Sequence, residues 1–242
     1  VDVQSTSPGN SAGVTVRSGG WSFPVQSISS KSYWQVLDDQ GGSWMWERMT
    51  GDTEEISWMA TALSTGTLLM AADGSYNKNK STLISGAGWI IYCPISGKRI
   101  QGSAYEKSTS AGSYRGEMLG LLALYATIAT AHLYFQLNET SGTIIGDNQS
   151  ALGQAHRKIK RVTSSEKQPD IIRAIRAAKY QCQGAKFKKV WVKSHVDDLK
   201  SWRELTIEQK MNTLCDELAK AAVREGIEDT RLTSSRLLPY EA

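Results

Sequence analysis

The chain has 242 residues, 40% of them apolar and 21% charged, a composition typical of a globular protein with one large domain or one domain plus an appendage. No apolar run approaches the ~20 residues that span a bilayer, and no basic-then-apolar leader opens the chain, so we expect neither a membrane protein nor a secreted one. The three cysteines are far apart, which disfavours disulfides and thiolate zinc sites and favours an intracellular location, in the cytoplasm or nucleus.

The net charge of +4 is concentrated in one stretch of the chain. Residues 156–193 carry 12 basic and 2 acidic side chains, whereas residues 1–72 and 194–242 each carry more acidic than basic ones. Such a basic stretch favours a polyanionic partner, because counterions are released when phosphates are bound. A solvated helix face and loop would have the same composition, so charge alone does not decide between the two.

The first 66 residues divide into two predicted segments. Residues 1–20 are rich in Ser, Gly and Thr without helical periodicity and are typical of a linker or tail. Residues 21–66 contain five of the eight tryptophans, and we interpret them as a small, Trp-rich helical connector that packs on the main domain. An aromatic platform for nucleic-acid bases is the alternative.

Residues 67–226 carry a clearer pattern and form the predicted main domain, with residues 227–242 as a C-terminal tail. An apolar run over 67–72 that ends at Asp73 predicts a central strand, and runs over 88–93 and 99–105 predict two antiparallel neighbours. Residues 114–133 are apolar nearly all round, which predicts a deeply buried helix.

The second half of this domain alternates between predicted strands and helices. A short strand is expected over 143–147, helices near 148–157 and 169–180, and a half-buried strand over 187–195. A capping box of Thr206 and Gln209 begins the last helix, which we expect to end near Gly226. Because a helix between strands requires a crossover, the expected fold is α/β with a five-stranded mixed sheet flanked by helices.

Four acidic residues stand where isolated surface acids would not be expected. Asp73 and Asp147 each close an apolar strand, and, if these strands are parallel neighbours, both carboxylates reach the edge where α/β sheets bind ligands. Glu117 lies in the first turn of the buried helix, and Asp216 flanks the apolar stripe of the last one. Each acid alone is explained by a turn or a helix cap; their joint placement favours a shared site.

Four converging carboxylates repel one another unless cations hold them together. Oxygen ligands favour Mg²⁺, with Mn²⁺ as a substitute, over zinc. Two such ions about 3.5–4 Å apart can clamp the attacking and leaving oxygens of a phosphodiester. His195 ends the predicted last strand at the same sheet edge and could shuttle a proton, although a structural histidine explains it nearly as well.

Five short strings occur in order: ADGS at 72–75, YRGE at 114–117, GDNQ at 146–149, VKSH at 192–195 and NTLCDELA at 212–219. Together they resemble type 1 ribonuclease H. The strings SYRGE at 113–117 and SHVDD at 194–198, with the long insert before the last helix, most resemble the domain that follows reverse transcriptase in eukaryotic retroelements. The resemblance covers roughly residues 67–225 and implies a ribonuclease H-like fold. It also implies an endonuclease that uses two Mg²⁺ ions to hydrolyse the RNA strand of RNA–DNA hybrids, with the hybrid and an attached reverse transcriptase as partners.

The resemblance also implies roles for particular residues. Asp73, Glu117, Asp147 and Asp216 would bind metal, with Asp73 bridging both ions, and His195 would assist product release or proton transfer. The positions implied to contact nucleic acid are Gln149, Asn79, Ser113, Tyr114, Arg157, Lys158, Lys160 and Arg161. The residues at 113 and 114 replace the paired asparagines of many cellular members, so hybrid recognition is expected to differ in detail. The stretch 196–210 is long and could cover the mouth of the site or merely decorate it.

Two other functions use a similar fold. A DNA strand-transfer enzyme of the integrase or transposase kind usually relies on three acids and lacks the histidine strand and the Asp216 helix string. A non-catalytic module that binds nucleic acid or scaffolds a polymerase usually loses metal ligands, whereas all four acids are present here.

Overall fold

The computed structural model describes residues 15–18, 21–24, 30–157 and 162–230. Strands β1 (Thr15–Ser18) and β2 (Trp21–Pro24) pair antiparallel as a separate two-stranded sheet. The predicted linker over 1–20 therefore contains a strand in its described part. The rest of that segment, and the predicted tail beyond residue 230, lie outside the described residues.

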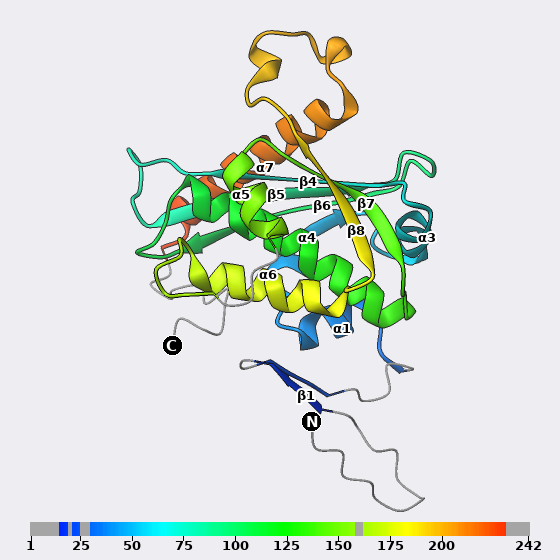
Figure 1. The fold of residues 1–242 in the computed structure, drawn as a ribbon. Coiled ribbons are helices and arrows are strands. Elements are labelled where there is room, and N and C mark those ends of the chain that lie inside the picture. The colour runs from blue at the N-terminus through cyan, green and yellow to red at the C-terminus, as the bar shows by residue number, and fades with distance from the viewer. Residues whose placement is uncertain (1–14, 19–20, 25–29, 158–161, 231–242) are drawn as a thin grey trace, which may run out of the picture.

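A mixed sheet in the order β3-β6-β5-β4-β7-β8 lies at the centre of the molecule (Figure 1). Strands β3 (Met49–Gly51), β4 (Leu68–Ser75), β5 (Ile84–Tyr92) and β6 (Arg99–Lys107) pair antiparallel, whereas β7 (Thr140–Gly146) and β8 (Ala185–Trp191) run parallel to β4. The predicted α/β class with a mixed sheet is confirmed. The predicted count of five strands is wrong, because β3 pairs with β6; a three-residue strand is too short to show periodicity.

Helices cover both faces of this sheet (Figure 1). Helices α4 (Ser113–Phe135), α5 (Gln149–His156) and α6 (Pro169–Gln181) share one hydrophobic core with Met70 and Ala72 of β4. Helix α7 (Ile207–Glu228) packs Met211 and Cys215 on the opposite face, against Ala71. Because neighbouring residues of β4 point to opposite faces, its continuous apolar run reflects burial on both sides.

Helix α4 corrects one sequence-based expectation. It has 23 residues and a mean hydropathy of 1.5 over 18 of them, so by length and composition it could cross a membrane, contrary to the expectation that no run is long enough. In the fold, 78% of that window is buried among other elements. Such burial is typical of the core helix of a folded domain.

The Trp-rich segment contributes to the same core as α4. It forms α1 (Tyr33–Asp39), α2 (Ser43–Trp46) and α3 (Ser57–Thr65), which ends at a left-handed Gly66. The Tyr33 hydroxyl donates to the Thr127 carbonyl of α4 at 2.8 Å, and Trp58 as a whole residue is 6% exposed. Trp34 and Trp44 are half-buried against the same core, so these three rings are used for packing.

The last helix begins as predicted and ends later than predicted. The capping box of Thr206 and Gln209 is formed in full, but α7 continues past Gly226 to Glu228. A Cβ atom at Gly226 would lie 2.8 Å from the Tyr105 ring. This glycine therefore permits close packing of α7 on the sheet and does not terminate the helix.

Candidate metal and nucleic-acid site

Three of the predicted acids meet at one end of the sheet. Asp73 lies in β4, Asp147 directly follows β7, and Glu117 lies near the start of α4, four residues after Ser113. One carboxylate oxygen from each lies within 4.8 Å of the other two. The parallel pairing of β4 with β7, in which Ala71 is opposite Ile145, brings Asp73 and Asp147 to the same edge.

Two glycines allow α4 to approach β4 closely enough for this meeting. A Cβ atom on Gly74 would overlap the backbone nitrogen of Glu117, and one on Gly116 would overlap the carbonyl oxygen of Gly86. Any larger residue would push the start of α4 away from the sheet. The glycine beside each of these two acids therefore sets the distance between Asp73 and Glu117.

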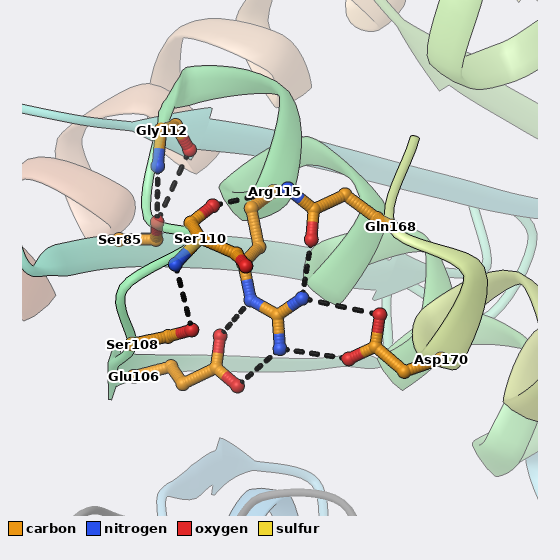
Figure 2. Close-up of polar contacts among 8 residues, drawn as sticks. All are labelled: Ser85, Glu106, Ser108, Ser110, Gly112, Arg115, Gln168 and Asp170. Atoms are coloured by element: carbon orange, nitrogen blue, oxygen red, sulfur yellow. Dashed lines mark hydrogen bonds and ion pairs between the residues drawn. The ribbon is translucent and has the colours of Figure 1, made fainter. Parts of the chain in front are cut away.

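A buried arginine, Arg115, also holds the start of α4 in place, through its bonds to β6 and α6 (Figure 2). The Arg115 guanidinium donates to both carboxylate oxygens of Glu106 on β6. It also donates from Nη2 to Asp170 Oδ2 on α6, at 2.9 Å, and from Nη1 to the side-chain carbonyl of Gln168. The Gln168 amide in turn donates to the Ser110 carbonyl at 3.0 Å. The buried Arg115 side chain thus connects β6, α4 and α6 through charge-assisted hydrogen bonds. Arg115 lies two residues before Glu117, so these bonds hold the part of α4 that carries Glu117.

Burial and mutual repulsion raise the pKa values of the clustered acids. Desolvation, followed by the charge of Asp147, raises the pKa of Asp73 to about 7, although the Gly74 N–H opposes the shift with a 2.6 Å bond. Desolvation and the charges of Asp73 and Asp147 raise the pKa of Glu117 well above its usual value. Desolvation also raises the pKa of Asp147. A nearby cation would relieve this cost of ionisation.

Asp216 and His195 line the same cavity, which has a volume of about 180 Å³. Asp216 does not belong to the group of oxygens within 4.8 Å of one another; its Oδ2 accepts from Lys220 Nζ at 2.6 Å. Asp216 therefore already has a cation beside it, supplied by its own helix. Lys220 lies one turn further along α7, where a helix brings side chains four residues apart together.

His195 reaches the cavity from a turn. Strand β8 ends at Trp191, so the prediction that His195 ends the strand is wrong. The histidine has φ of 52°, in the left-handed region, and precedes the short 3₁₀ turn Val196–Asp198. From this position between β8 and the turn, His195 lines the cavity. A second 3₁₀ turn, Trp202–Glu204, follows in the same long stretch.

The predicted long stretch over 196–210 only partly borders the site. Val196 and Gln209, near its two ends, line the cavity, whereas Leu199 between them is 72% exposed. Figure 1 shows this segment as an arch that projects beyond the sheet. The ends of the stretch therefore form part of the cavity wall, and its middle extends into solvent.

Asn212 is a further site residue, to which the sequence analysis assigned no role. It lies one turn before Asp216, is 5% exposed, and its Nδ2 donates to Asp73 Oδ2 at 3.3 Å. Its Oδ1 is buried without a hydrogen-bond partner among the described residues. An orphaned amide oxygen beside three crowded carboxylates fits an oxygen-ligated divalent cation. The i, i+4 spacing of Asn212, Asp216 and Lys220 on one helix was the available sequence signal.

Some predicted nucleic-acid contacts lie near the acids. Ser113 lines the same cavity, and Gln149 lines an adjoining hollow of about 510 Å³ that includes Glu117 and Asp147. The side chain of Asn148 caps α5 and so places Gln149 at this edge. Trp191, absent from the prediction, borders the hollow and donates from its indole N–H to the Asp147 carbonyl at 2.7 Å.

Other predicted contacts lie away from the cavity or outside the described residues. Asn79 is exposed in the loop between β4 and β5 and is not one of the residues lining the cavity. Tyr114 is half-buried, with Lys167 Nζ 6.0 Å from its ring centroid. Arg157 is exposed at the end of α5. The remaining three, Lys158, Lys160 and Arg161, lie outside the described residues.

Comparison with known proteins gives likeness of fold only. No protein-family model and no curated protein sequence matches the chain. The N-terminal RNase H domain of Rv2228c from Mycobacterium tuberculosis is 15% identical, with a TM-score of 0.45 over 68% of this chain and 98% of that one. LC11-RNase H1, isolated from compost by a metagenomic approach, is 14% identical, with a TM-score of 0.46 over 67% and 99%. The prototype foamy virus protease–reverse transcriptase is 14% identical, with a TM-score of 0.46 over 65% of this chain and 21% of that one.

Proposed function

We propose that this protein is a divalent-metal-dependent endonuclease that hydrolyses the RNA strand of RNA–DNA hybrids, a ribonuclease H of type 1. One observation carries the proposal: carboxylate oxygens of Asp73, Glu117 and Asp147, from three different elements, converge within 4.8 Å in a cavity that Asp216 also lines. Their raised pKa values mean that the cluster ionises readily only when a cation compensates it.

The chain's own residues have distinct roles in this proposal. Asp73, Glu117, Asp147 and Asp216 would hold two Mg²⁺ ions, or Mn²⁺ in their place, and Asp73 would serve both ions. The chemistry that such ions would supply at these carboxylates is a lower pKa for the attacking water and charge stabilisation for the leaving 3′-oxygen. His195, on the cavity wall, moves a proton or assists product release.

Residues around the four acids select the RNA–DNA hybrid as substrate. Ser113 and Gln149 contact 2′-hydroxyls of the RNA strand, which DNA lacks. Asn79 is a further contact of the kind made by Gln149, in the minor groove on the RNA strand, and Tyr114 stands beside Ser113 at a position that faces the 2′-hydroxyls. Arg157 and the basic residues that follow it grip the hybrid. The partner of the site is therefore an RNA–DNA hybrid, and no membrane partner is involved.

We further propose that the domain belongs to a reverse transcriptase polyprotein of a eukaryotic retroelement and acts inside the cell, in the cytoplasm or nucleus. The strings SYRGE at 113–117 and SHVDD at 194–198 support this setting through their resemblance to such domains. Both strings contribute residues to the cavity wall, among them Glu117 and His195.

The test is cleavage of an end-labelled RNA–DNA hybrid in Mg²⁺, followed on a gel. We expect cleavage by the unaltered chain, none with a chelator, and a loss of about a hundredfold or more in Asp73→Asn, which keeps the shape but removes the charge of the proposed shared ligand. Asp39→Asn is the matched control, because Asp39 is exposed on α1 and pairs with Lys31.

Each alternative has its own outcome in the same assay. Equal cleavage by the unaltered chain and Asp73→Asn would show that this site is not responsible. Hybrid binding without cleavage in Mg²⁺ or Mn²⁺ would favour the non-catalytic module, and joining of DNA ends would favour a strand-transfer enzyme.

A further inference from the structure

An ion pair joins the fourth acid of the site to a lysine of its own helix. Lys220 Nζ lies 2.6 Å from Asp216 Oδ2, one helical turn away on α7. Among the ion pairs found within the described part of the chain, this is the one that reaches a cavity carboxylate. The charges acting on Lys220 are those of Asp216, Asp197 and Asp73, so the amine faces the acid cluster.

The pair divides the four acids into two groups. Asp73, Glu117 and Asp147 form a crowded set of oxygens and belong to none of the ion pairs found within the described residues, whereas Asp216 already has a counter-ion at 2.6 Å. Lys193 and His195 line the same cavity without such a contact to the three acids. A first divalent ion therefore meets three carboxylates that gain from its arrival. A second ion that uses Asp216 must take this carboxylate from the lysine and tolerate a neighbouring positive charge.

Exposure allows this exchange to take place without unfolding. The Lys220 side chain is 50% exposed and that of Asp216 is 21% exposed. An i, i+4 ion pair that water can reach is weak, because water competes for both partners. The lysine can therefore leave into solvent by rotating its flexible side chain, while α7 stays in place.

We propose that Lys220 is a positioning residue that serves as the built-in counter-ion of Asp216 and weakens uptake of the second divalent ion relative to the first. This inference rests on the proposed metal-dependent function. In this inference, the positive charge of Lys220 is the reason that the site binds the second divalent ion more weakly than the first.

The test is a calorimetric titration of the full chain with Mn²⁺, supported by electron paramagnetic resonance of the free ion. We expect two binding steps, the second weaker. Lys220→Met should tighten the second step by about two- to tenfold, since a repelling unit charge is lost, and leave the first within about twofold. Lys220→Arg keeps the charge and should restore the original difference between steps.

Lys98→Met is the matched control. It also removes one positive charge and one exposed ion pair, that of Lys98 with Glu55. Lys98 directly precedes β6, whose first residue, Arg99, pairs with Tyr92 of β5. Asp73 pairs with Gly88 of β5, four residues before Tyr92, so Lys98 lies away from the acid cluster along the sheet. Both of its binding steps should match those of the unaltered chain.

The outcomes separate the two proposals. An unchanged second step in Lys220→Met, or an equal shift of that step in Lys98→Met, overturns the role of Lys220 alone. If the unaltered chain binds one Mn²⁺ ion and Lys220→Met binds two, the role of Lys220 is supported. If both chains bind one Mn²⁺ ion, that role is overturned. Absence of Mn²⁺ binding in the unaltered chain overturns the proposed function and this inference together.

Discussion

Asp73 is the residue in which burial, hydrogen bonding and charge repulsion meet. It is 5% exposed, accepts from the Gly74 N–H and from Asn212, and faces the charges of Asp147 and Asp216. Desolvation and repulsion outweigh the hydrogen bonds, so the pKa rises to about 7. A carboxylate in an ordinary salt bridge shows the opposite shift. The residue is therefore costly to ionise until a cation is bound.

This shift predicts an unusual pH dependence of stability in the metal-free protein. The pKa of Asp73 is about 7 when folded, against an ordinary value of 3.8, so between these values the folded state binds more protons than the unfolded chain. Its contribution to stability is present at the acidic end of that window and is lost as pH rises toward 7. We expect the Tm in chelator to fall between about pH 5.5 and about pH 7.5, followed by circular dichroism.

Asp73→Asn is the variant that checks this assignment. It should have a higher Tm than the unaltered chain near pH 7.5 and a flatter profile, because the amide does not ionise. Asp39→Asn should follow the unaltered chain. Parallel profiles for the unaltered chain and Asp73→Asn would show that other groups cause the pH dependence.

In helix α4, tertiary packing overrides the intrinsic helix propensity of a single residue, Gly116. Ala is about 1 kcal/mol better than Gly inside a helix, so propensity alone disfavours Gly116. The fold needs glycine there because the helix backbone touches the Gly86 carbonyl of β5. A Cβ atom on Gly153, inside α5, would meet no atom of the described residues within 4 Å, so no such contact requires a glycine at that position.

A pair of glycine substitutions distinguishes contact from propensity. Gly116→Ala should destabilise the fold by about 1–3 kcal/mol through overpacking and weaken Mn²⁺ binding by moving Glu117. Gly153→Ala should leave stability unchanged or raise it by up to about 1 kcal/mol. Chemical unfolding with a Mn²⁺ titration of each variant measures both effects. A rise in stability for both variants would contradict the close approach of α4 to the sheet.

At the scale of the whole molecule, the Trp-rich segment and the main domain share one core. Leu37, Met45, Met59 and Leu63, from α1, α2 and α3, have no exposed surface and join the core cluster that contains α4. Strand β3 adds to the edge of the same sheet. Removal of several such side chains costs about 2–5 kcal/mol each, against a typical total stability of about 5–15 kcal/mol.

Truncation tests this shared core directly. A chain that starts at residue 67 should lose cooperative thermal unfolding and associate on size-exclusion chromatography, because it exposes the apolar surface that α1, α2 and α3 cover. A chain that starts at residue 30 keeps these helices and should unfold cooperatively. Cooperative unfolding of both chains with similar Tm values would show that the segment is an independent appendage.

The sequence by itself determined the order of strands and helices from residue 67 onward, because periodicity and caps depend on neighbours a few residues apart. The apolar run before Asp73, the all-apolar helix after Ser113 and the capping box at Thr206 are local signals of this kind. The expectation that Asp73 and Asp147 meet followed from one topological rule about parallel strands. The roles of these residues in catalysis stay predictions.

Only the tertiary structure decided which distant groups pair with one another. The pairing of β3 with β6, the contact of Arg115 with Asp170, and the burial of Gly226 against Tyr105 join residues far apart in the chain. The contact of Lys220 with Asp216 is local, but its position beside the cluster depends on how α7 lies on the sheet. Such contacts depend on the packing of whole elements, and no short window of sequence carries that information.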